Sequence, residues 1–99
     1  MGEPLRFHPA VAHDLTTATR WYDEISDALG SRFRHAVSVR LDTIEKNPQL
    51  YGRVQGDIRA ARVSGFPFII AFVNNDRATE IIGIFHTATD PDKLKTRTL

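Results

Sequence analysis

Arg59 and His86 are the first candidates for chemistry in this sequence. The planar guanidinium of an arginine pairs with two phosphate oxygens at once, and a histidine titrates near neutral pH, where it can donate or accept a proton. Each residue also has an ordinary alternative. Arg59 can be a solvated strand arginine or pair with a helix carboxylate, and His86 can bond to backbone at a strand end. Arg62 lies three residues after Arg59, so in a regular strand the two point to opposite faces unless a bulge intervenes.

Three basic residues near the end of the sequence, Lys93, Lys95 and Arg97, form a second candidate group. Their charge suits them to binding an anionic partner or to stabilising a cleaved phosphate. The ordinary alternative is a solvated tail, because the segment 87–99 is polar. Trp21 flanks the apolar stripe of a predicted helix, where it can cover the rim of the core or meet a partner.

The other histidines, His8, His13 and His35, are scattered, and their spacing matches no metal site. The chain has no cysteine, which excludes disulfides and cysteine-based zinc sites. We therefore expect neither a metal nor a cofactor.

The composition is that of one globular domain over residues 1–99, with 41% hydrophobic and 25% charged residues. The net charge of +1 and the pI near 8.2 lie below the strongly basic values of dedicated nucleic-acid binders. The longest apolar run, Phe66–Val73, is too short to cross a bilayer, and the first residues show no secretory pattern. We expect a cytoplasmic protein without membrane contact.

Two helices are predicted in the first half, after a short strand at 5–7. Apolar residues of the first helix recur at spacings of four and three, which places them on one stripe; they are Val11, Leu15, Ala18, Tyr22, Ile25 and Leu29. Asp14 falls on the opposite side, which we expect to be solvated. Gly30 is a favourable helix stop and Ser31 an N-cap for a second helix that ends at Asn47-Pro48. The two helices then form a tight antiparallel hairpin.

The second half of the sequence predicts strands. The segment 49–57 is polar and rich in turn residues, and strands are expected at 58–63, 68–73 and 79–85. Short connections make these three strands an antiparallel meander. The predicted fold class is therefore α+β, with the order β-α-α-β-β-β and an αα-hairpin packed on one face of an antiparallel sheet.

Several short motifs occur in an order that narrows this fold further. They are Phe7-His8-Pro9-Ala10, Trp21-Tyr22, Leu29-Gly30-Ser31-Arg32-Phe33, Asn47-Pro48, Arg59 seven residues before Phe66-Pro67-Phe68, Phe85-His86 and Asp90-Pro91. From about Leu5 to Arg97, this succession resembles the RelE/ParE superfamily of type II toxin–antitoxin toxins, and its ParE-like plasmid stabilisation branch in particular. The resemblance implies a RelE-like two-layer fold. It also implies a cognate antitoxin, for which we expect a groove along the helix hairpin and the sheet edge.

The resemblance implies three alternative functions. Toxins of the ParE kind inhibit growth by poisoning DNA gyrase and need no catalytic residues. Toxins of the RelE kind cleave mRNA on the ribosome; there an arginine at the position of Arg59 holds the phosphate, and His86 stands where a general acid or base is often found. The third alternative is a binding module that has lost its activity.

The ParE-like alternative is favoured by the modest net charge and by the lack of a tyrosine after His86. Whether the chain is an enzyme, and whether two copies pair, stays open. An anionic or protein partner is expected to contact Arg59, Arg62, Lys93, Lys95, Arg97 and Trp21.

Overall fold

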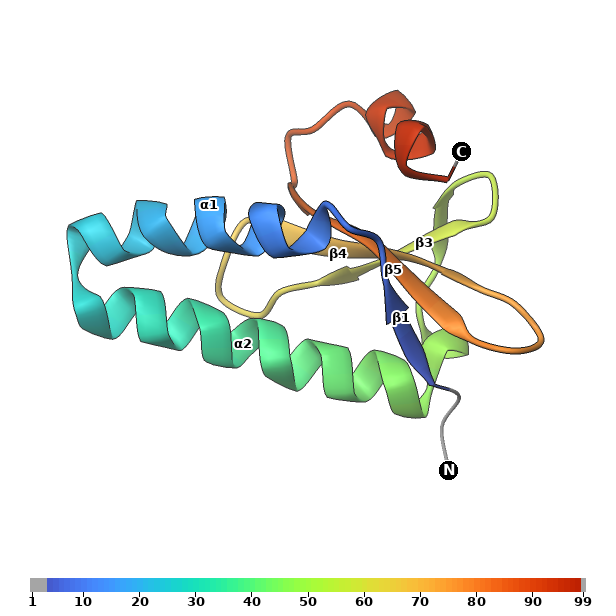
Figure 1. Cartoon of the computed structure of the whole chain (residues 1–99), viewed down its shortest axis with the longest axis horizontal. Helices are drawn as coiled ribbons and strands as arrows, with labels where there is room; N and C mark the ends of the chain where they lie inside the picture. The colour runs from blue at the N-terminus through green and yellow to red at the C-terminus, as the bar shows by residue number, and fades with distance from the viewer. Residues whose placement is uncertain (1–3, 99) are drawn as a thin grey trace.

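The computed structural model describes residues 4–98, which form two long helices and one five-stranded sheet (Figure 1). The elements are β1 (Leu5–Phe7), α1 (Val11–Ile25), α2 (Asp27–Lys46), the 3-10 helix η1 (Pro48–Leu50), β2 (Arg53–Gln55), β3 (Ile58–Arg62), β4 (Phe68–Asn74), β5 (Thr79–His86) and the 3-10 helix η2 (Pro91–Arg97). The helices α1 and α2 lie side by side, and the end where they join projects beyond the sheet (Figure 1). The predicted α+β class, with a helix hairpin over a sheet, is confirmed.

The sheet is mixed rather than antiparallel throughout, in the order β1-β5-β4-β3-β2. The strands β3, β4 and β5 form the predicted antiparallel meander, whereas β1 runs parallel to β5. The sequence analysis also missed β2, an edge strand within the segment 49–57 that we predicted as turns. Both differences concern strands of only three residues, which carry too little alternation to reveal a partner or a direction.

The corner of the helix hairpin lies at Ser26, so the predicted stop at Gly30 and cap at Ser31 are wrong. The backbone of Ser26 is extended (φ −165°, ψ 149°), and its Oγ accepts a hydrogen bond from the amide of Leu29 at 3.0 Å. This is the usual N-cap arrangement, and it begins α2 earlier than predicted. Gly30 is buried inside α2, where a Cβ would lie 1.6 Å from Asp23 Oδ1 and 3.3 Å from Asp23 Cα. The glycine therefore serves the close approach of the two helices.

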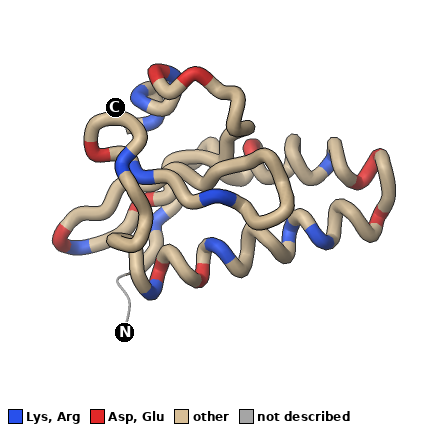
Figure 2. Tube along the Cα trace, turned by 180° about the vertical axis from the view of Figure 1, so that it is seen from behind, with Lys and Arg blue, Asp and Glu red and all other residues tan. Residues whose placement is uncertain are grey.

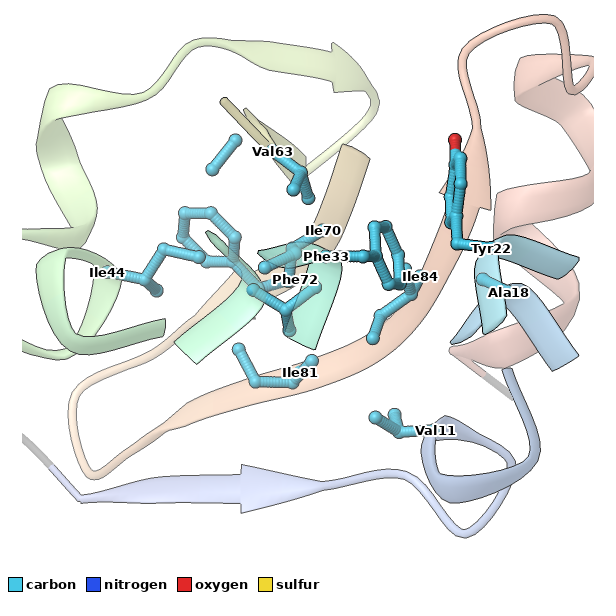
Figure 3. Close-up of a cluster of buried hydrophobic side chains, with 12 residues drawn as sticks. Val11, Ala18, Tyr22, Phe33, Ile44, Val63, Ile70, Phe72, Ile81 and Ile84 are labelled. Carbon is cyan, nitrogen blue, oxygen red and sulfur yellow. The ribbon is translucent and has the colours of Figure 1, made fainter. Parts of the chain in front are cut away.

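The main core lies between the hairpin and one face of the sheet (Figure 3). Phe33 of α2 is fully buried at its centre, with ring centroids 5.0 Å from Tyr22, 5.1 Å from Phe66 and 5.2 Å from Phe68. Edge-on and tilted contacts of this kind add to the free energy gained by burial. The predicted burial of Tyr22 is confirmed, whereas Ile25, predicted on the same stripe, is 64% exposed because α1 ends there.

A second, smaller core covers the opposite face of the sheet. It contains Ile58, Ala71, Ile82 and Leu94. Leu94 belongs to η2, which packs against β2 and β5 and is seen apart from the hairpin in Figure 1. The ordinary alternative of a solvated tail holds for the side chains of Lys93 and Lys95, which are exposed, but not for the segment as a whole, because Leu94, 2% exposed, packs it onto the sheet.

Tyr22 should make the stability of the fold sensitive to alkaline pH. Burial raises the pKa of Tyr22 above its ordinary value of 10.0, so the folded chain holds the phenol proton more tightly than the unfolded chain. The stabilisation that Tyr22 gives to the folded chain is therefore fully present below about pH 10 and is lost as the pH rises further. We expect Tyr22→Phe to flatten the decline in the free energy of unfolding above about pH 10, measured by urea denaturation. Parallel curves for the two proteins would contradict this assignment.

Candidate functional site

Arg59 and His86 lie on the same face of the sheet but do not form one site. Arg59 pairs with Phe72 of β4, and His86 pairs with Phe68 of the same strand. Four residues along a strand correspond to about 13 Å, and β4 separates the two residues. A general acid or base must lie within hydrogen-bond reach of the group it serves, so the two side chains cannot act together on one phosphate in this conformation.

The guanidinium of Arg59 is partly occupied inside the protein. Its Nη1 donates a hydrogen bond to the backbone carbonyl of Tyr51 at 2.5 Å, and the side chain is half-buried. The remaining N–H groups are available to an anion. Arg62 is exposed, and the pairing of β3 with β4 is regular from Arg59 to Arg62, so the two arginines face opposite sides as predicted.

His86 is exposed at the end of β5. Its Nδ1 accepts a hydrogen bond from the amide of Ala88 at 3.0 Å, and its ring meets the ring of Phe68 edge to face at 5.4 Å. The neutral imidazole therefore carries its proton on Nε2. This is the backbone-bonded, strand-end arrangement that was the ordinary alternative for His86.

Arg97 is used internally, because it forms an ion pair with Asp14. Their side chains are 21% and 12% exposed, and the guanidinium meets both carboxylate oxygens, at 2.8 Å and 3.1 Å. The prediction of a solvated Asp14 is therefore wrong. The hydrogen bonds that Arg97 donates to the carboxylate of Asp14 raise the pKa of Arg97. Gly83 leaves room for this pair, since a Cβ there would lie 2.8 Å from Arg97 Nη1.

The other predicted binding residues are exposed but dispersed. Lys93 and Lys95 lie on η2, on the sheet face opposite the hairpin. Trp21 is 65% exposed and stands one turn before the exposed Ile25, near the hairpin corner. The structure therefore does not gather these three residues with Arg59 into one surface.

An apolar groove lies where β1 and the start of α1 meet α2. Its volume is about 380 Å³, and it is lined by Phe7, His8, Pro9, Val11, Ala12, Leu15, Val37, Leu41 and Ile84. Phe7 is 51% exposed although it is a large apolar residue. The groove follows the helix hairpin and one sheet edge, which is where the sequence analysis expects an antitoxin groove.

Two residues near Arg59 were missed by the sequence analysis, namely Arg40 and Tyr51. Arg40 of α2 donates from Nη1 to the phenol oxygen of Tyr51 at 3.1 Å and from Nε to the carbonyl of Arg62 at 2.8 Å. Neither residue is among the candidates named from the sequence. No short-range pattern could have joined them, because their contact spans eleven positions in sequence and depends on how α2 packs on the sheet.

Within residues 4–98, no three His, Asp or Glu side chains gather closely enough to hold a metal ion. No helix in this part of the chain has the length and apolar character needed to cross a membrane.

Comparisons with known proteins bear on the fold of this chain. No family model matches the chain, and no curated protein matches it. A solved chain described as "Chromosomal ParDE TA system from P. aeruginosa" matches with a TM-score of 0.65 and 18% identity, covering 85% of this chain and 95% of that chain. Since unrelated functions can share a fold, the match at this identity bears on architecture. This chain thus has the α+β fold of a chain from a ParDE TA system, a helix hairpin packed over a mixed sheet.

Proposed function

We propose that this chain is the toxin of a type II toxin–antitoxin module, neutralised by a cognate antitoxin, and that it inhibits growth by binding an essential target such as DNA gyrase. The observation that carries the proposal is the fold, which it shares over 85% of its length with a chain of a ParDE TA system. The motif succession that resembles the ParE-like branch points the same way. The proposal includes action in the cytoplasm.

The positions of the candidate catalytic residues favour protein binding over catalysis. Arg59 and His86 are separated by about 13 Å along β4 alone, and each already bonds to backbone. A toxin that traps a protein target needs neither residue to touch a reacting atom. The alternative of a ribosome-dependent mRNA endonuclease would need both side chains, or a substrate-driven rearrangement that brings them together.

Induction in bacteria and an assay on purified gyrase test this proposal together. Induction of the chain alone is expected to arrest growth, and co-expression of the adjacent open reading frame is expected to restore it. Purified chain is expected to inhibit DNA supercoiling by gyrase or to trap cleaved DNA. Unimpaired growth would favour the inactive module. Growth arrest with unaffected gyrase and new mRNA ends in ribosome toeprints, lost in Arg59→Ala and His86→Ala, would favour the endonuclease.

We propose the apolar groove as the binding site of the antitoxin. An amphipathic partner segment would bury apolar surface against the groove, and a charge introduced there would be left without a partner. We expect Ala12→Glu to weaken antitoxin binding roughly thirtyfold, the equivalent of about 2 kcal/mol, measured by titration of the purified proteins. In cells, this variant should arrest growth even when the antitoxin is co-expressed.

Ala28→Glu is the matched control for this variant. Ala12 and Ala28 are both exposed alanines at the second position of a long helix, but only Ala12 lines the groove. The control should bind the antitoxin as the unmodified chain does. If both variants weaken antitoxin binding equally, or if neither variant weakens it, the antitoxin binds elsewhere on the chain.

A further inference from the structure

Tyr51 is held between two arginines at the edge of the sheet opposite the apolar groove. Arg40 Nη1 donates to its phenol oxygen at 3.1 Å, and Arg59 Nη1 donates to its carbonyl oxygen at 2.5 Å. The guanidinium of Arg40 also lies over the tyrosine ring, 5.9 Å from its centre. Both arginines are thus fixed by neutral partners, and these contacts bring no negative charge to either of them.

A third arginine extends this positive surface. Arg53 of β2 stands directly opposite Arg59 in the strand pairing. Arg40 is fixed further by a hydrogen bond from its Nε to the carbonyl of Arg62, whose own side chain points to the opposite face of the sheet. We call Arg40, Arg53 and Arg59 the arginine cluster. The view from behind shows basic segments of α2 and of the strand beside it close together, with few acidic segments between them (Figure 2).

The arginine cluster lacks matching negative charge. Its one ion pair within residues 4–98 joins Arg53 to Asp57 at 4.0 Å, and both of these side chains are largely exposed. Like charges facing each other across a strand pair destabilise a sheet, and an exposed pair at that distance offsets little of this. The cluster therefore costs stability in the free chain, a cost that an anionic partner would remove.

The apolar neighbours of the arginine cluster indicate whether its anionic partner is a nucleic acid or a protein segment. Leu50 and Val54, each one residue from Tyr51 or Arg53, are 67% and 47% exposed. Sites for single-stranded nucleic acid pair positive charge with exposed aromatic rings on which bases stack. The ring here belongs to Tyr51, half-buried, covered by Arg40 and set edge-on against Phe72 at 6.0 Å. Aliphatic side chains beside arginine forks suit a protein segment instead.

We infer that the arginine cluster, with Leu50 and Val54, binds a segment of a partner protein rich in Asp and Glu. Carboxylates of the segment would pair with the free guanidinium N–H groups, and its apolar residues would cover Leu50 and Val54. The site lies at the β2 edge of the sheet, whereas the apolar groove lies at the β1 edge. The inference therefore does not depend on the identity of the protein that fills the groove.

Fluorescence anisotropy with a labelled poly-glutamate peptide tests this inference on the full chain. The variant Arg53→Gln removes an exposed charge from the arginine cluster and leaves the hydrogen bonds of Arg40 and Arg59 to Tyr51 in place. We expect it to weaken peptide binding about fivefold or more. The control, Arg32→Gln, removes the same charge from an exposed position on α2. We expect less than a twofold change in this control.

Two further measurements test the inference on the full chain. Arg59→Lys retains the charge but not the planar fork, and we expect it to weaken peptide binding severalfold while circular dichroism stays unchanged. Equal weakening by Arg53→Gln and Arg32→Gln would reduce the effect to net charge and overturn the inference. Tighter binding of a labelled single-stranded RNA than of the peptide at equal salt, abolished by Arg53→Gln, would also overturn it, in favour of nucleic acid.

Discussion

Phe33→Ala is expected to lower the free energy of unfolding by about 3–5 kcal/mol. The side chain is fully buried beside Tyr22 of α1 (Figure 3), and it also packs against the rings of Phe66, just before β4, and Phe68, at the start of β4. Removing the ring would leave a cavity where the hairpin rests on the sheet. A domain of this size is stable by roughly 5–15 kcal/mol, so the variant should be marginal. Urea denaturation followed by circular dichroism measures the change.

Phe7→Ala is the control for this substitution. It removes the same atoms from a side chain that is 51% exposed on β1, so we expect a loss of less than about 1 kcal/mol. The two variants should also differ in function. Phe7 lines the apolar groove, so its loss should weaken binding of the proposed antitoxin rather than destabilise the fold. A Phe33 variant no less stable than the Phe7 variant would show that the aromatic cluster does not anchor the hairpin.

The apolar periodicity of the sequence was enough to predict the layers of this fold. Stripes at helical spacing and the apolar run around Ile70 give the helix hairpin and the sheet centre, because burial of these residues dominates the free energy of folding. The hairpin corner was misplaced because Gly30 can either end a helix or permit close helix contact. Sequence alone cannot separate these uses, since the deciding contact is with Asp23, on the other helix.

The candidate site was predictable only in part. Arg59, Arg62 and His86 lie on the sheet as expected, but their separation follows from register, which a one-residue slip would alter. Arg40 and Tyr51 join Arg59 only through tertiary packing. Charged residues that pair across long stretches of sequence leave no local pattern, and Asp14 with Arg97 is the clearest example here.

Breaking the Asp14–Arg97 pair is expected to destabilise the chain by roughly 2–3 kcal/mol. A fully buried pair that loses one member costs about 3–5 kcal/mol, and the slight exposure of this one lowers that figure. Asp14→Ala would also deprive the amide of Ile84 of its acceptor at 3.0 Å, and would free η2 from α1. Because the hydrogen bond to Asp14 raises the already high pKa of Arg97 further, the stabilisation that the charged arginine provides is lost only at strongly alkaline pH. Its effect should thus be constant across the neutral range.

A double-mutant cycle separates this pair from its surroundings. Asp14→Ala, Arg97→Met and the double variant should give a coupling free energy of about 1–3 kcal/mol by urea denaturation. Asp42 and Lys46, paired at 3.0 Å on the exposed side of α2, should give at most about 0.5 kcal/mol in a matching cycle. Coupling near zero for Asp14 and Arg97 would mean that Leu94 alone holds η2 on the sheet. A large coupling would show that the ion pair fastens η2 to the helix hairpin. A partner that displaces η2 would then also affect α1 and the groove beside it.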